Sequence, residues 1–202
     1  IALATFFNAN AQTQSNYSGS SKFTDNVSVT VQGGVLTKFN DFYTSHPATT
    51  PIVLVGVDKY ITPVFGVGIE GRTLIKTGSQ NTSTAFDYIN VSGYLKANLA
   101  NMFAYNDKRH LFEPVIYTGL GWGHGTKGYP EFYTDATHTH INTMTYRAGA
   151  ELNFNLGSSR NFAIVVNPSV VWGNIDNGKL LKKNGCFEVT AGLVYHFNTS
   201  NG

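Results

Sequence analysis

Polar and apolar residues alternate one by one along most of this chain, and that period of two constrains the fold more than any other feature. A strand turns successive side chains to opposite faces, so the alternation predicts β-strands with one apolar face. In the last run, Val189 and Leu193 share one face, while Glu188 and Thr190 share the other. Eight such runs occur, over Asn26–Leu36, Ile52–Tyr60, Val64–Ile75, Phe86–Leu99, Leu111–Gly123, Met144–Phe154, Phe162–Gly173 and Phe187–Phe197.

Most of the mid-strand charge falls on the face opposite the apolar one. These residues are Asp58, Glu70, Arg72, Lys96, Glu113, Arg147, Glu151 and Glu188. Seven glycines share that face and leave room for long side chains: Gly56, Gly66, Gly68, Gly119, Gly121, Gly149 and Gly192. A soluble barrel has the reverse polarity, so the pattern favours a membrane barrel with a polar interior. Because buried ions must be paired or hydrated, we expect a network in which Arg72, Arg147 and Lys96 hold the five carboxylates.

The composition agrees with a membrane barrel but does not establish one. Charged residues make up 13% of the chain, about half of the usual quarter, and the mean hydropathy is −0.13. A soluble β-sandwich can reach similar totals. No stretch approaches the roughly 18 consecutive apolar residues of a transmembrane helix.

The connections between the runs alternate in length. Residues 61–63, 100–110 and 157–161 form the shorter ones, and residues 37–51, 76–85, 124–141 and 174–186 the longer, polar ones. Short periplasmic turns and long extracellular loops are typical of outer-membrane barrels. The chain is therefore predicted to be all-β, an eight-stranded antiparallel up-and-down transmembrane β-barrel over residues 26–197. Its place would be the cell outer membrane, with both termini periplasmic and the long loops extracellular.

Aromatic residues gather towards the two ends of the runs and predict interfacial girdles. One band comprises Phe65, Phe112, Phe154, Phe162, Tyr195 and Phe197, and the other Trp122, Tyr146, Trp172 and Phe187. The interior of an eight-stranded barrel is just wide enough for side chains to fill. A general porin is therefore disfavoured, and the charge network is interpreted as structural, with a gated or leaky water path as the alternative.

The ends of the chain differ from the barrel in character. Residues 1–7 are mostly apolar, and Ala9 and Ala11 match a signal-peptidase site, which predicts a signal-peptide remnant over 1–11 with cleavage after Ala11. An ordinary strand or a disordered leader is the alternative. Residues 12–25 are expected to be a polar leader, and 198–202 the start of a linker or a C-terminal stub.

Other features point to no chemical site. Gly119–Gly125 is rich in glycine, but no helix follows it to hold a phosphate. His124, His138, His140 and Asp135 supply residue types for a metal or rim hydrolase but no definable constellation. The net charge of +2 without a Lys/Arg run argues against nucleic acid, and the single cysteine against an internal disulfide. We expect no enzyme activity, cofactor or metal.

Four segments resemble the N-terminal barrel of the outer-membrane protein A family as it occurs in Bacteroides-type bacteria. They are Tyr60–Gly71, Gly119–His124, Glu151–Gly157 and Leu193–Phe197, in one register over about residues 22–197. The resemblance implies a structural barrel, surrounded by outer-membrane lipid and lipopolysaccharide, which supports envelope integrity. It also implies a longer protein whose periplasmic domain binds peptidoglycan, although no peptidoglycan-binding residue can be carried over to this chain.

Two other classes of function remain open. The barrel could be a narrow channel, a loop-based receptor or an accessory subunit in a complex with other outer-membrane proteins. A rim hydrolase or acyltransferase is the enzyme alternative.

Overall fold

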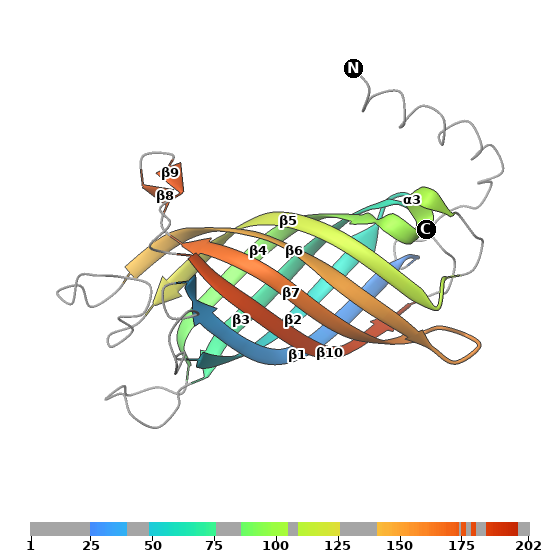
Figure 1. Ribbon diagram of the computed structural model, residues 1–202, viewed down its shortest axis with the longest axis horizontal. Helices are drawn as coiled ribbons and strands as arrows, with labels where there is room; N and C mark the ends of the chain where they lie inside the picture. The colour runs from blue at the N-terminus through green and yellow to red at the C-terminus, as the bar shows by residue number, and fades with distance from the viewer. Residues whose placement is uncertain are drawn as a thin grey trace, which may run out of the picture.

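The computed structural model describes residues 25–39, 49–75, 86–104, 109–125, 141–173, 175–176, 179–180 and 185–197. Within these ranges, eight strands form one closed barrel (Figure 1). The strands are β1 (Val27–Lys38), β2 (Thr49–Tyr60), β3 (Phe65–Ile75), β4 (Phe86–Asn98), β5 (Phe112–Gly125), β6 (Ile141–Leu156), β7 (Phe162–Gly173) and β10 (Gly185–His196). The described chain also holds a short helix, α3 (Leu99–Phe103), and a two-stranded sheet of β8 (Ile175–Asp176) and β9 (Lys179–Leu180) outside the barrel.

Each barrel strand pairs antiparallel with its neighbours in the sequence, and β10 closes the barrel on β1. The closing register sets Val31 opposite Leu193 and continues on both sides without a shift. Closure leaves no strand edge exposed to pair with another chain. The predicted eight-stranded antiparallel up-and-down β-barrel is therefore confirmed.

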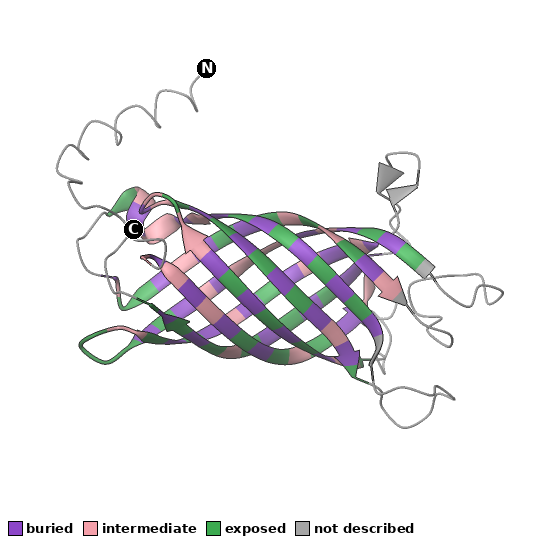
Figure 2. Cartoon of the chain, turned by 180° about the vertical axis from the view of Figure 1, so that it is seen from behind, coloured by how far each residue is buried: buried purple, intermediate pink, exposed green. Residues whose placement is uncertain are grey.

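Burial alternates residue by residue along the strands, which appears in Figure 2 as bands of purple and green across the barrel wall. On β3, for example, Glu70 is buried at 7% exposure, while its neighbour Ile69 is 66% exposed. The polar members face inward and the large aliphatic ones face outward along the barrel. The fold thus has a polar interior and an apolar exterior, the reverse of a soluble protein.

Short connections gather at one end of the barrel, called the turn end below; the opposite end is the loop end. In the β2–β3 turn, the N–H groups of Ile61 and Thr62 donate to the carbonyl of Phe65 at 2.9 and 3.1 Å. The β6–β7 turn uses two residues with positive φ, Gly157 (70°) and Arg160 (52°). β1 begins and β10 ends at the turn end.

The connection after β4 contains a helix that the sequence analysis did not predict. Asn98 caps α3 by accepting a hydrogen bond from the N–H of Asn101 at 3.2 Å. The side-chain amide of Asn101 donates to the Pro63 carbonyl at 2.8 Å, which ties α3 to the β2–β3 turn. Five residues make little more than one turn, too short for a helical period to be visible in the sequence.

The predicted signal-peptide remnant over 1–11, nearly all of the polar leader over 12–25 and the stub over 198–202 lie outside the described residues. Among the helices of the described part, none is long and apolar enough to span a membrane.

Candidate functional site

The barrel lumen holds the charged residues that the sequence singled out. All eight are buried, with side chains from β2, β3, β4, β5, β6 and β10 converging on the axis: Asp58, Glu70, Arg72, Lys96, Glu113, Arg147, Glu151 and Glu188. They do not form one network. The structure divides them into three groups along the axis.

The group nearest the loop end combines two arginines with two glutamates. Arg72 donates to Glu188 Oε1 at 2.7 Å and also contacts Glu70, its neighbour on the same face of β3. Arg147 donates to Glu188 Oε2 at 2.7 Å and to Glu70 at 3.5 Å. Each carboxylate therefore meets both guanidinium groups, and the four formal charges cancel. Such charge-assisted pairing is what allows full ions to remain in a barrel interior.

A second group lies nearer the turn end and is centred on one lysine. Lys96 Nζ lies 2.8 Å from Asp58 and 2.7 Å from Glu151, so β4 is linked through the lumen to β2 and β6. Lys96 Nζ also lies 5.9 Å from the centre of the Tyr117 ring. Two carboxylates face one ammonium here, which makes Lys96 the residue that holds this group together.

Glu113 belongs to neither group, which corrects the expectation that all five carboxylates share three cations. Its partner is Arg109, whose Nη1 lies 3.6 Å from Glu113 Oε2, and its other oxygen accepts from the His110 N–H at 2.9 Å. Arg109 is buried at 5% exposure although it precedes β5. The sequence analysis placed Arg109 in a connection, where no alternation marks a residue as inward-facing.

Neutral polar and aromatic side chains fill the lumen between the charged groups. Tyr94 and Tyr117 meet edge to face with centroids 5.3 Å apart, and the Tyr117 hydroxyl donates to Asn167 at 2.7 Å. Across the β1–β10 closure, Thr190 donates to Gln32 at 2.6 Å. These contacts cross-link opposite walls of the barrel.

An apolar layer closes the lumen at the loop end. Its members, all nearly inaccessible, are Leu36, Ile52, Leu74, Tyr88 and Cys186. Below it, a cavity bounded by Arg72, Arg147 and Glu188 measures ≈ 10 Å³, and a second cavity beside Asp58 and Arg109 measures ≈ 10 Å³. Each is about the smallest space that admits one water molecule. The described lumen is therefore a packed interior with isolated small voids.

Three of the inward glycines show why the lumen needs them. A Cβ on Gly119 would lie 2.3 Å from the Tyr94 ring, and one on Gly68 would collide with Asp58 Oδ1. On Gly192 it would collide with the carbonyl of Val31 across the β1–β10 pair. The glycines thus provide the space that the large lumen side chains occupy.

The ten aromatic residues of the two predicted bands lie on outward-facing positions of the wall. At the turn end, Phe112 and Phe154 lie 5.0 Å apart, and Phe162 and Tyr195 4.9 Å apart, between ring centroids. Phe65 and Phe197 are exposed at the same end. Towards the loop end, Tyr146 lies 5.6 Å from Trp172, and Trp122 and Phe187 are exposed.

The residues considered for chemistry do not assemble in the described chain. His124 lies beside Trp122 and its Nδ1 is 2.9 Å from Asn142 Oδ1. His138, His140 and Asp135 lie outside the described residues. In the ranges that are described, no group of three or more His, Cys, Asp or Glu side chains is arranged to hold a metal ion.

Two solved structures share this architecture. The N-terminal β-barrel domain of Pseudomonas aeruginosa OprF matches with a TM-score of 0.51 and 12% identity, covering 85% of this chain and 97% of that one. Neisserial surface protein A matches with a TM-score of 0.50 and 12% identity, covering 86% of this chain and 98% of that one. No protein-family model and no curated protein sequence matches the chain. At this identity the likeness concerns the fold, and the fold is that of the small eight-stranded outer-membrane β-barrels.

Proposed function

We propose that this chain is a structural barrel of the outer membrane, related to the outer-membrane protein A family, which supports envelope integrity. The observation that carries the proposal is the inverted polarity of the barrel. Large aliphatic side chains such as Leu95 (65% exposed) and Val55 (54%) face outward, while the ions lie paired inside. Only a hydrocarbon surrounding makes that arrangement stable, because in water the apolar surface would drive aggregation.

The packed lumen supports a structural role over a transport role. An apolar layer closes the loop end, and two ionic groups follow it along the axis. A steady water path would require several of these contacts to open together. The narrow channel therefore remains the alternative, together with a loop-based receptor or an accessory subunit that contacts other outer-membrane proteins.

The orientation that this function needs has the turn end in the periplasm and the long loops outside the cell. The lipid partners are then phospholipid in the periplasmic leaflet and lipopolysaccharide in the outer leaflet. A peptidoglycan-binding domain would continue from the periplasmic end in the longer protein that the family resemblance implies. The Bacteroides-type assignment belongs to the same proposal and rests on the four segments quoted above.

One experiment tests orientation and insertion together. An epitope is inserted between Ser158 and Ser159 in the β6–β7 turn, and in a second variant between residues 132 and 133. We expect antibody to label intact cells only through the second site, and both sites after permeabilisation. Labelling of the turn on intact cells would contradict the orientation.

A second experiment tests the structural role. Deletion of the gene should increase vesicle release and detergent sensitivity, and the wild-type gene should restore both. Purified protein in planar bilayers should give no steady conductance. Normal envelope behaviour in the deletion strain, combined with a steady current from the pure protein, would favour the channel.

A further inference from the structure

The outward wall of the barrel is hollowed on the side formed by β2 to β6. A hollow of ≈ 770 Å³ surrounds Gly93, between Val57, Ile69, Leu120 and Tyr146. A second hollow of ≈ 410 Å³ lies towards the turn end and reaches Ile61, Phe65 and Ile116. Both hollows are lined by Val67, Leu95 and Thr118, so they form one continuous depression, here called the Gly93 groove.

The register of five strands creates the groove. One row of paired outward residues crosses the wall from β2 to β6: Val57, Ile69, Gly93, Leu120 and Tyr146. The neighbouring row towards the turn end on β2 is Lys59, Val67, Leu95, Thr118 and Ala148. Gly93 has no side chain at the centre, and a Cβ there would lie 4.0 Å from the nearest atom. Four strand spacings of about 4.8 Å give the groove a length of roughly 19 Å.

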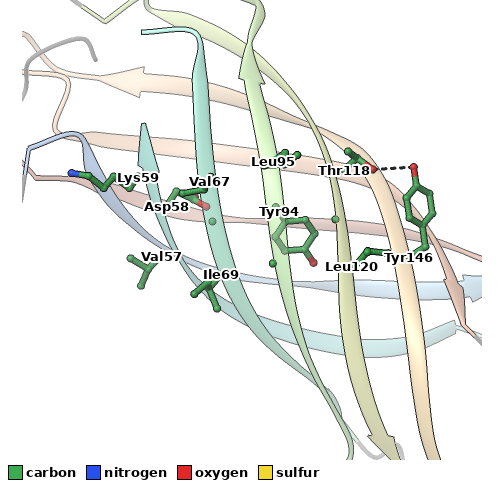
Figure 3. A pocket seen from close by; sticks show the side chains of 13 residues that line it. Val57, Asp58, Lys59, Val67, Ile69, Tyr94, Leu95, Thr118, Leu120 and Tyr146 are labelled. Carbon is green, nitrogen blue, oxygen red and sulfur yellow. Dashed lines mark hydrogen bonds between the residues drawn. The ribbon is translucent and has the colours of Figure 1, made fainter. Parts of the chain in front are cut away.

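The lining of the groove calls for an apolar occupant. Figure 3 shows aliphatic side chains around it and one polar pair, Thr118 and Tyr146. Their hydroxyl groups share a hydrogen bond of 2.9 Å, and Thr118 Oγ1 also lies 3.3 Å from the Arg147 carbonyl. Because these polar groups are paired within the protein, an occupant gains nothing by offering polar groups of its own along the groove.

Positive charge marks one end of the groove. Lys59 is the last outward-facing residue of β2 at the turn end, and its side chain borders the hollow (Figure 3). Its Nζ donates to the Asp25 carbonyl at 3.0 Å, which holds the ammonium at the rim. The groove therefore matches a long apolar molecule with an anionic group at one end.

The shape separates two kinds of occupant. A second barrel presents a convex wall, which cannot follow a narrow depression across five strands. A flexible hydrocarbon chain can. One leaflet of the hydrocarbon core is about 15 Å thick, so a tilted acyl chain from that leaflet fits a groove of roughly 19 Å.

We propose that the Gly93 groove binds one acyl chain of a phospholipid of the periplasmic leaflet, with the lipid phosphate at Lys59. This inference rests on the proposed function, which orients the turn end towards the periplasm. The barrel would then carry a resident lipid on the β2–β6 side, in addition to the exchanging lipids around the rest of its wall.

The test uses the full chain refolded in mixed micelles that contain dimyristoyl phosphatidylglycerol, with bound lipid counted by native mass spectrometry. Wild-type protein should retain one phospholipid per barrel. Gly93→Leu fills the groove and should weaken retention at least about tenfold, because tenfold corresponds to about 1.4 kcal/mol and each buried methylene contributes about 0.8 kcal/mol. Lys59→Gln should weaken retention of phosphatidylglycerol but leave retention of the uncharged dimyristoylglycerol unchanged.

Gly71→Leu is the matched control. Gly71 faces outward on β3, a Cβ there has nothing within 4 Å, and it lies outside the lining of the groove. This variant adds the same apolar side chain and should retain lipid as the wild type does. Equal retention by Gly93→Leu would overturn the proposal, as would a wild-type dimer that Gly93→Leu dissociates.

Preferential retention of lipopolysaccharide over phosphatidylglycerol by the wild type would also overturn it, since the occupant would then come from the other leaflet. A barrel that enters lipid vesicles but retains no phospholipid contradicts only this inference. A barrel that does not enter vesicles contradicts the proposed function itself.

Discussion

Glu188 of β10 and Arg147 of β6 are joined by a hydrogen bond of 2.7 Å through the lumen, although β7 separates their strands in the wall. Glu188 also accepts from Arg72, so one fully buried carboxylate bridges two guanidinium groups. The contact shows how the closed barrel brings together residues that the sequence keeps far apart.

Glu188→Gln should destabilise the barrel strongly. The variant leaves Arg72 and Arg147 with Glu70 alone, and removing one partner of a buried pair costs roughly 3–5 kcal/mol. Denaturant unfolding in lipid vesicles measures the change. The double variant Glu188→Gln/Arg147→Met restores charge balance and should recover part of the loss, and a loss that simply adds would contradict the coupling.

Gly119→Ala should also destabilise the barrel, for a steric reason. The new Cβ would lie 2.3 Å from Tyr94 and 2.4 Å from the Gly93 carbonyl, and overpacking of this kind costs about 1–3 kcal/mol. Gly71→Ala is the control, because nothing lies within 4 Å of its Cβ. The same unfolding measurement compares the two, and equal stabilities would refute the packing argument.

Charge on the outer wall should be tolerated according to its depth in the membrane. Val55→Arg places a guanidinium at mid-wall and should cost about 2–4 kcal/mol of folding free energy in vesicles, whereas Ile61→Arg at the turn should cost about 0–1 kcal/mol. Val55 is 54% and Ile61 68% exposed, so neither change disturbs the lumen. Similar costs at both positions would argue against a hydrocarbon layer around the barrel.

Cys186 should resist thiol reagents while the barrel is folded. It is 2% exposed and packs in the apolar layer with Leu36, Ile52 and Leu74. Maleimide labelling, followed by mass spectrometry, should be slow in vesicles and fast after unfolding. Val189→Cys in a Cys186→Ser background gives the outward-facing control in detergent micelles, and rapid labelling of folded Cys186 would show that the loop end is open.

The sequence by itself determined the strands, their number and the face that each side chain takes. Those properties follow from a period of two, which is local and can be read from any run of about ten residues. Glu70 and Arg72, for instance, had to share a face because they are two positions apart. The polar interior of the barrel followed from the same parity.

Only the tertiary structure decided which charges meet and where the wall is hollow. Arg72 and Glu188 are 116 positions apart, and closure of β10 on β1 sets their distance. Arg109 lies before its strand, so no alternation revealed its pairing with Glu113. Gly93 is visible in the sequence, but the groove around it exists because the register of five strands aligns their outward residues in rows. Register is a property of paired strands, and no single run of residues contains it.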